Sequence, residues 1–103
     1  MIKWTPKSEN DLENILIHIT KNFDIDLASE IVYGIIDYTE ITLTKNPLAG
    51  KLLTSNPLFA KLVYKGNSIY YCENPTDKNL YIVYVQARKM KFKPRRLNDN
   101  EVA

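Results

Sequence analysis

Two long amphipathic segments joined by a very short break constrain the fold of this chain more than any other feature. The first starts at Thr5-Pro6, where a threonine side chain suits a helix cap and a proline suits the first helical position. Its apolar residues recur at the spacing of one helical face, and acidic or amide residues take the other face. The apolar set is Leu12, Ile15, Leu16, Ile19 and Phe23, and the polar set is Glu9, Asp11, Glu13 and Asn14.

The second segment follows after residues 22–24 and extends to about Lys45, with Asp24 or Asp26 as its cap. Its apolar stripe is Ala28, Ile31, Val32, Ile35, Thr39 and Leu43. Asn46-Pro47 ends it, because proline disfavours the helical conformation in the residue before it. So short a connection between two helices predicts an antiparallel helical hairpin.

Strand patterns flank this hairpin on both sides. Residues 2–4 alternate apolar and polar, and residues 58–65, 68–73 and 80–87 are three runs rich in Val, Ile, Tyr and Phe. Residues 47–57 contain two prolines and a glycine, and we predict a loop there. The order is β-α-α-β-β-β, which predicts an α+β fold with the hairpin packed on a small, largely antiparallel sheet.

Length and composition favour one domain inside the cell. With 103 residues the chain has room for a single core, and we predict one domain over residues 1–96 and a frayed tail over 97–103. The apolar runs are too short to span a bilayer and no signal peptide begins the sequence, so we expect a cytoplasmic protein. Cys72 is the single cysteine and is expected to be a small core residue, and no residues have metal-ligand spacing.

Charge is distributed unevenly along the chain. Residues 1–50 hold four lysines against eight acidic residues, whereas residues 51–96 hold ten basic residues against two acidic ones. Six of the ten basic residues lie close together: Arg88, Lys89, Lys91, Lys93, Arg95 and Arg96. Such a density is typical of contact with phosphates or with an acidic protein surface.

The order of these elements and three sequence fragments resemble the ParE/RelE toxin superfamily over nearly the whole chain. The fragments are Ile2-Lys3-Trp4-Thr5-Pro6-Lys7 leading into Asp11-Leu12-Glu13-Asn14-Ile15, then Asn46-Pro47-Leu48-Ala49-Gly50-Lys51, then Lys65-Gly66-Asn67-Ser68-Ile69-Tyr70-Tyr71. The resemblance implies a growth-inhibiting toxin without a cofactor, held inactive by a cognate antitoxin that also mediates any contact with operator DNA. We expect that antitoxin to be acidic where it covers residues 61–96.

The superfamily contains ribosome-dependent mRNA endonucleases similar to RelE and DNA gyrase inhibitors similar to ParE. Cleavage of RNA needs a proton acceptor, a proton donor and cations that stabilise the charged phosphorane. Lys61 and Arg88 match a strand lysine and a late arginine of the RelE-like enzymes. Two of their residues are missing, however. Ser68 stands where they have an arginine before the Ile69-Tyr70-Tyr71 strand, and the position of their late catalytic tyrosine falls near Pro94. Under the nuclease hypothesis the candidate catalytic residues are Lys61, Lys65, Arg88 and Lys91.

The ParE-like alternative needs a binding surface and no catalytic apparatus. Ser68 suits it, and the stretch from Arg88 to Arg96 is then the segment expected to contact gyrase or the DNA bound to it. A third hypothesis is a family member that has lost toxicity and serves as antitoxin partner or co-repressor.

Alternation places Tyr70 and Tyr71 on opposite faces of the sheet, so we expect one of the two to be exposed. Aromatic rings next to lysines can stack on RNA bases. The one histidine, His18, is expected to flank the first helix stripe.

Overall fold

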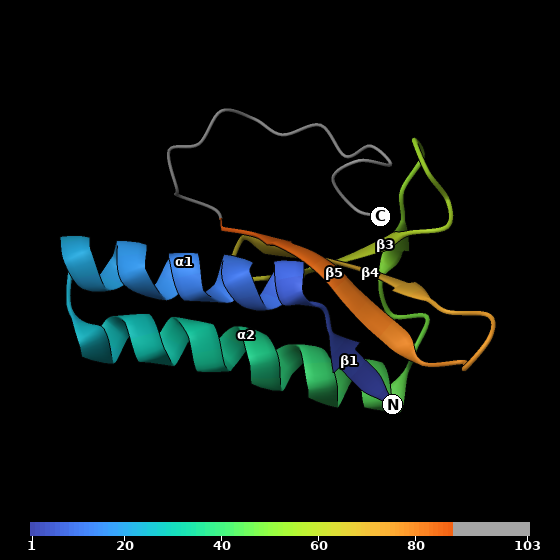
Figure 1. Cartoon of the computed structure of the whole chain (residues 1–103), viewed down its shortest axis with the longest axis horizontal. Coiled ribbons are helices and arrows are strands. Elements are labelled where there is room, and N and C mark those ends of the chain that lie inside the picture. The colour runs from blue at the N-terminus through green and yellow to red at the C-terminus, as the bar shows by residue number, and fades with distance from the viewer. Residues whose placement is uncertain (88–103) are drawn as a thin grey trace.

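A computed structural model describes residues 1–87 of the chain (Figure 1). The elements are β1 (Ile2–Trp4), α1 (Pro6–Asn22), α2 (Ile25–Lys45), β2 (Lys51–Leu52), β3 (Ala60–Tyr64), β4 (Asn67–Glu73) and β5 (Leu80–Gln86). Two predictions lie outside the described residues: the basic stretch over 88–96 and the tail over 97–103. Within residues 1–87, no helix is long and apolar enough to cross a membrane.

The helical hairpin forms as the sequence predicts. The Thr5 side chain accepts a hydrogen bond from the Ser8 amide at 3.2 Å, and the Asp24 side chain accepts one from the Leu27 amide at 2.7 Å. These two caps satisfy amides that have no partner within the first turn of each helix. The helices lie side by side and form one layer, with the sheet as the second layer (Figure 1).

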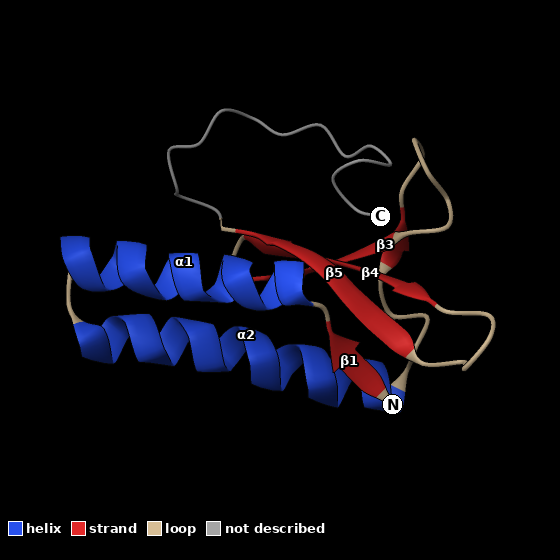
Figure 2. Cartoon of the chain, viewed as in Figure 1, coloured by secondary structure: helices blue, strands red, loops and turns tan. Residues whose placement is uncertain are grey.

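The sheet is mixed, with strand order β1-β5-β4-β3-β2. β1 runs parallel to β5, and the other neighbouring strands are antiparallel, which confirms a largely antiparallel sheet (Figure 2). The prediction of a continuous loop over residues 47–57 was wrong, because Lys51 and Leu52 pair with Lys61 and Ala60 to form β2. A strand of two residues leaves no alternating pattern that a sequence can show.

The main core lies between the hairpin and one face of the sheet, which we call the helix face. Leu12, Ile15, Val32, Ile35 and Leu43 come from the helices, and they pack on alternate residues of the strands. The strand residues are Ala60, Leu62, Ile69, Tyr71, Ile82 and Val85. Burial of this apolar surface is the main stabilising contribution to the fold.

Two residues of the first amphipathic segment do not lie where the helical pattern put them. Phe23 was expected in the core but is 70% exposed, because the helix ends at Asn22 and Phe23 is its cap residue with a non-helical backbone. Asp11 was assigned to the polar face but is buried. Its carboxylate has two partners, described below, which make burial of a charged group tolerable.

Candidate functional site on the open face of the sheet

The face of the sheet that the hairpin does not cover, here called the open face, carries the candidate site. Ala60 and Leu62 point to the helices, so Lys61 between them points to the open face. Lys61 lies opposite Tyr70 on β4, and Tyr70 lies opposite Tyr84 on β5. On its other side Lys61 lies opposite Lys51 on β2. The open face therefore carries one row across four strands: Lys51, Lys61, Tyr70 and Tyr84.

Both central tyrosines of this row are buried, although they share a face without helices. The rings of Tyr70 and Tyr84 stack with centroids 5.3 Å apart, and Leu53, Phe59 and Tyr81 pack beside them. Tyr71 is buried in the core on the helix face, so our expectation that Tyr70 or Tyr71 would be exposed was wrong. A second, smaller apolar cluster on the open face buries the outward tyrosine instead.

A bulge in β5 builds that second cluster. Tyr70 pairs with Tyr84 and Tyr71 pairs with Ile82, so Val83 is an extra residue in β5. The extra residue lets Val83 and Tyr84 join the same open-face cluster even though they are adjacent in sequence. The bulge thus changes which strand residues face the helices, and Val85 returns to the main core.

Lys7 and Asp11 form an ion pair at the margin of the open face, and sequence reasoning assigned neither residue a role. The Lys7 amine lies 2.6 Å from Asp11 Oδ1 and 4.7 Å from the centroid of the Tyr84 ring. Asp11 Oδ2 accepts a hydrogen bond from the buried amide of Val85 at 3.0 Å. The spacing of four residues on one helix was the available signal, because such pairs lie on one face.

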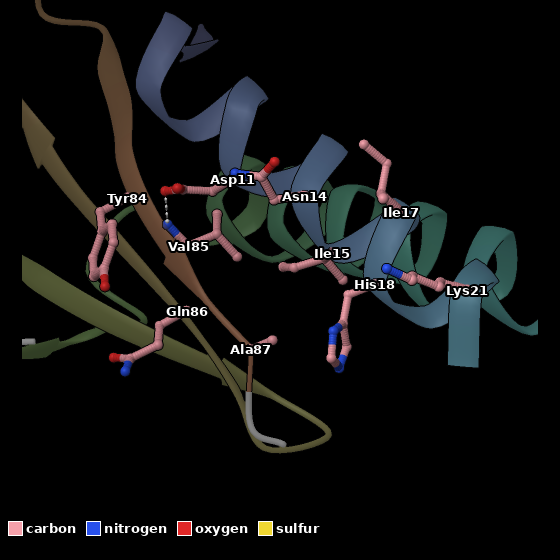
Figure 3. A pocket seen from close by; sticks show the side chains of 10 residues that line it. All are labelled: Asp11, Asn14, Ile15, Ile17, His18, Lys21, Tyr84, Val85, Gln86 and Ala87. Atoms are coloured by element: carbon pink, nitrogen blue, oxygen red, sulfur yellow. Dashed lines mark hydrogen bonds between the residues drawn. The ribbon is translucent and has the colours of Figure 1, made fainter. Parts of the chain in front are cut away.

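Figure 3 shows Asp11 reaching from α1 to the backbone of β5. β1 pairs with β5 only from Leu80 to Ile82, so the Val85 amide has no neighbouring strand to bond with on this side. Asp11 takes the place of the missing strand. Beyond it, α1 and β5 enclose a hollow of about 350 Å³ whose lining includes His18, Lys21 and Gln86.

The structure describes two of the four candidate catalytic residues predicted from the sequence, Lys61 and Lys65. Lys61 lies on the open face, half-buried beside Tyr70. Lys65 occupies the β3–β4 turn with φ of 48°, and its amine lies 5.6 Å from the ring of Tyr64, which packs on the helix-face core. His18 is half-buried in α1 and lines the hollow beside β5. The remaining predicted site residues lie outside the described residues: Arg88, Lys89, Lys91, Lys93, Arg95 and Arg96.

Lys51 and Lys61, the two lysines of the open-face row, have no acidic partner within residues 1–87. The one ion pair among residues 1–87 is Lys7–Asp11, so Lys51 and Lys61 face each other without an acidic partner there. Like charges directly opposite on neighbouring strands repel. In the same part of the chain, no three His, Cys, Asp or Glu side chains are grouped so that they could hold a metal ion. The arrangement is suited to binding an anionic group.

Cys72 also faces the open side, and it is half-buried rather than part of the main core. Burial raises the pKa of its thiol, which disfavours the reactive thiolate at neutral pH. This environment suits the packing role that the sequence predicts for Cys72.

Tyr81 and Asp77 make a side-chain contact at the β4–β5 connection, and this contact gives a pH-dependent prediction. The Tyr81 hydroxyl donates to Asp77 Oδ2 at 2.6 Å, which lowers the pKa of the Asp77 carboxyl and raises the pKa of the Tyr81 phenol. A lowered pKa stabilises the fold above the ordinary carboxyl pKa, and this contribution is lost as the pH falls through the lowered value. In Tyr81→Phe the pKa of Asp77 should rise toward its ordinary value of about 3.9.

An NMR titration of the Asp77 carboxyl carbon between about pH 2 and pH 6 measures this shift, because that window brackets the ordinary carboxyl pKa. Tyr33→Phe is the matched control, because Tyr33 is an exposed tyrosine of α2, and it should leave the Asp77 titration unchanged. An unchanged Asp77 titration in Tyr81→Phe would show that the hydroxyl does not control this carboxyl.

No family model matches this chain, and no curated protein matches it. Solved structures with the same fold include the chromosomal ParDE TA system from P. aeruginosa, with 18% identity, a TM-score of 0.73, and coverage of 85% of this chain and 95% of that chain. The RelBE2 toxin-antitoxin complex from Mycobacterium tuberculosis matches with 16% identity, a TM-score of 0.65, and coverage of 85% and 96%.

A third similar structure is a YoeB/ParE toxin from Agrobacterium tumefaciens, with 16% identity, a TM-score of 0.58, and coverage of 84% of this chain and 95% of that chain. The two helices packed on a mixed five-stranded sheet define the class as α+β. The particular fold is that of the ParE/RelE toxins, as the sequence resemblance predicts.

Proposed function

We propose that this chain is the toxin of a type II toxin-antitoxin system and that a cognate antitoxin neutralises it. The toxin acts in the cytoplasm, where it binds and inhibits DNA gyrase as ParE-like toxins do. The observation that carries the proposal is the composition of the open face. It offers lysines for binding an anionic partner, and it has Ser68 where RelE-like nucleases have an arginine. The fold shared with a ParDE structure at a TM-score of 0.73 supports the same assignment.

The geometry of the candidate catalytic residues also favours inhibition by binding. Hydrolytic or transesterification chemistry on RNA needs an acid and a base on either side of the same phosphate. Among the candidates within residues 1–87, Lys61 belongs to the open-face row, whereas Lys65 lies by Tyr64, a residue of the helix-face core. Lys65 is therefore not paired with Lys61 on the open face. Tyr70 and Tyr84 are 8% and 2% exposed, so their rings offer no platform for a base.

One observation favours the mRNA endonuclease as a second candidate. Lys61 lies on the open face next to Lys51, where two cations close together would stabilise negative charge on a phosphate. Arg88, its expected partner in catalysis, lies outside the described residues. Of the four candidate catalytic residues, Lys61 is therefore the one that lies on the open face within residues 1–87.

Expression of the chain in bacteria tests the toxin assignment. Induction should arrest growth, and co-expression of the protein encoded by the adjoining reading frame should restore it. Primer extension on translating messages should show no new cleavage sites in the arrested cells. Cuts that disappear in Lys61→Ala would instead assign the chain to the endonucleases. Normal growth on induction would reject toxicity and favour an antitoxin partner that has lost it.

A further inference from the structure

The free edge of the sheet at β2 carries a group of exposed leucines. Leu48, Leu52 and Leu58 are 86%, 61% and 79% exposed, and all three line a hollow of about 370 Å³. We call these three residues the leucine edge. The hollow reaches inward to Tyr71, whose hydroxyl binds the backbone at Pro47 and Gly50 and so holds this part of the chain in place. A contiguous apolar surface on a small protein is typical of an interaction site.

The lysine pair lies on the other face of the same edge strand. Lys51 precedes Leu52 in β2 and lies opposite Lys61 on the open face, whereas Leu52 lies opposite Ala60 and so points to the helix side. An exposed strand edge normally invites pairing with another strand, including one from a second copy. Two copies meeting at this edge would bring both lysine pairs together, which charge repulsion opposes. The hollow has one acidic side chain in its lining, Glu73 on β4, two strands away from β2. The edge is therefore complementary to an acidic, partly apolar partner.

The same surface is poorly suited to nucleic acid. Recognition of single strands relies on aromatic rings that stack on bases. The tyrosines nearest the lysine pair, Tyr70 and Tyr84, are buried, and the exposed residue that follows Lys51 along the edge strand is Leu52. Burying leucine side chains favours a protein partner, because apolar contacts of this kind stabilise protein interfaces.

We propose that the leucine edge and the lysine pair together form a docking site for an acidic segment of the cognate antitoxin. The segment lies along the free edge at β2, so that an apolar side chain on its helix side enters the hollow between Leu48, Leu52 and Leu58. Carboxylates on its other side then pair with Lys51 and Lys61 on the open face. The proposal rests on the proposed function, since it needs an antitoxin. It names the surface that this antitoxin covers, which the fold by itself does not specify.

Binding of the protein encoded by the adjoining reading frame, measured by calorimetry with the purified full-length chain, tests the docking site. Leu58→Ala should weaken binding by about tenfold, and Lys61→Glu by about a hundredfold at low salt, as expected for central interface residues. Affinity should also fall as salt is raised. Ile41→Ala on α2 and Lys3→Glu on β1 are matched controls, since both residues are exposed and β1 is the opposite edge of the sheet from β2. Each control should change affinity by less than about threefold.

Lys51→Glu separates a binding role from a structural one. The variant removes the repulsion with Lys61, so its melting temperature should rise while its affinity for the antitoxin falls. A merely structural lysine would lower both quantities or leave affinity unchanged.

Three outcomes would overturn the docking site. The first is native affinity in both Leu58→Ala and Lys61→Glu, and the second is no binding of the adjoining gene product at all. The third is displacement of that protein by a single-stranded RNA oligonucleotide that the Lys61→Glu variant no longer binds. The last would assign the lysine pair to nucleic acid. Gyrase inhibition is measured on the chain without antitoxin, so the proposed target can fail while the docking site stands.

Discussion

Replacing Asp11 by alanine should lower the free energy of unfolding by about 2–3 kcal/mol, since it removes a buried hydrogen-bonding partner and one member of an ion pair. The Val85 amide is buried on the side of β5 where β1 has already ended, and Asp11 Oδ2 is the group that accepts its hydrogen bond. Without the carboxylate this amide stays buried and unsatisfied. The Lys7 amine also loses its partner, but the Lys7 side chain is 38% exposed, so solvent limits that part of the loss.

Urea denaturation followed by circular dichroism measures the change. Glu13→Ala is the matched control, because Glu13 is an exposed acidic residue of the same helix, and its effect should stay below about 0.5 kcal/mol. Asp11→Asn should fall between the two, since the amide oxygen can still accept from Val85 although the charge is lost. Equal stability of Asp11→Ala and Glu13→Ala would mean that Asp11 does not substitute for the missing strand.

Gly50→Ala should destabilise the fold by about 2–3 kcal/mol, through overpacking and a disturbed hydrogen bond. A Cβ atom at Gly50 would lie 2.5 Å from the Tyr71 hydroxyl and 2.6 Å from the edge of its ring. Tyr71 is 3% exposed, so the packing around it resists a shift of its ring. Its hydroxyl accepts from the Gly50 amide at 2.8 Å and donates to the Pro47 carbonyl at 3.1 Å, so both bonds would be disturbed together.

Gly34→Ala provides a matched comparison for this prediction. A Cβ atom there would lie 2.5 Å from the Tyr64 hydroxyl, a similar nominal clash. Tyr64 is half-buried, so its ring has room to turn, and the cost should be about 1 kcal/mol or less. Thermal unfolding of both variants checks the difference. If Gly34→Ala proves as costly as Gly50→Ala, the rigidity of Tyr71 does not explain why residue 50 is glycine.

The elements that were predictable from the sequence are those fixed by local chemistry. Thr5 and Asp24 are caps in the structure as they are in the pattern, and Asn46-Pro47 does end the second helix. Each of these signals depends on neighbours within four residues along the chain. The strand runs were equally visible, because alternating β-branched and aromatic residues mark a strand wherever it is placed.

What the sequence did not reveal depends on residues far apart in the chain. Asp11 was read as polar surface because only the fold shows that β1 stops short and leaves the Val85 amide without a strand partner. The opposition of Lys51 and Lys61 likewise follows from a pairing between β2 and β3 that no local pattern predicts. The bulge at Val83 shifted the face of Tyr84, and alternation alone cannot show such an extra residue.

The candidate site was predictable only in part for the same reason. Lys61 was correctly placed on a strand, but the structure places Lys65 beside Tyr64, away from that row. Both lysines belong to the same run of strand-like sequence, and the turn at Lys65, with its left-handed backbone, separates them. The sequence shows which residues are basic. Which of them share a face depends on where the strand ends, and alternation alone does not show that.

The most direct test of the proposed function is a DNA supercoiling assay with purified gyrase and the purified full-length chain. We predict that the chain inhibits ATP-dependent supercoiling in proportion to its concentration, and that addition of the adjoining gene product restores gyrase activity. Supercoiling and gyrase-mediated DNA cleavage that both remain unchanged at a large molar excess of the chain would contradict the assignment of gyrase as the target.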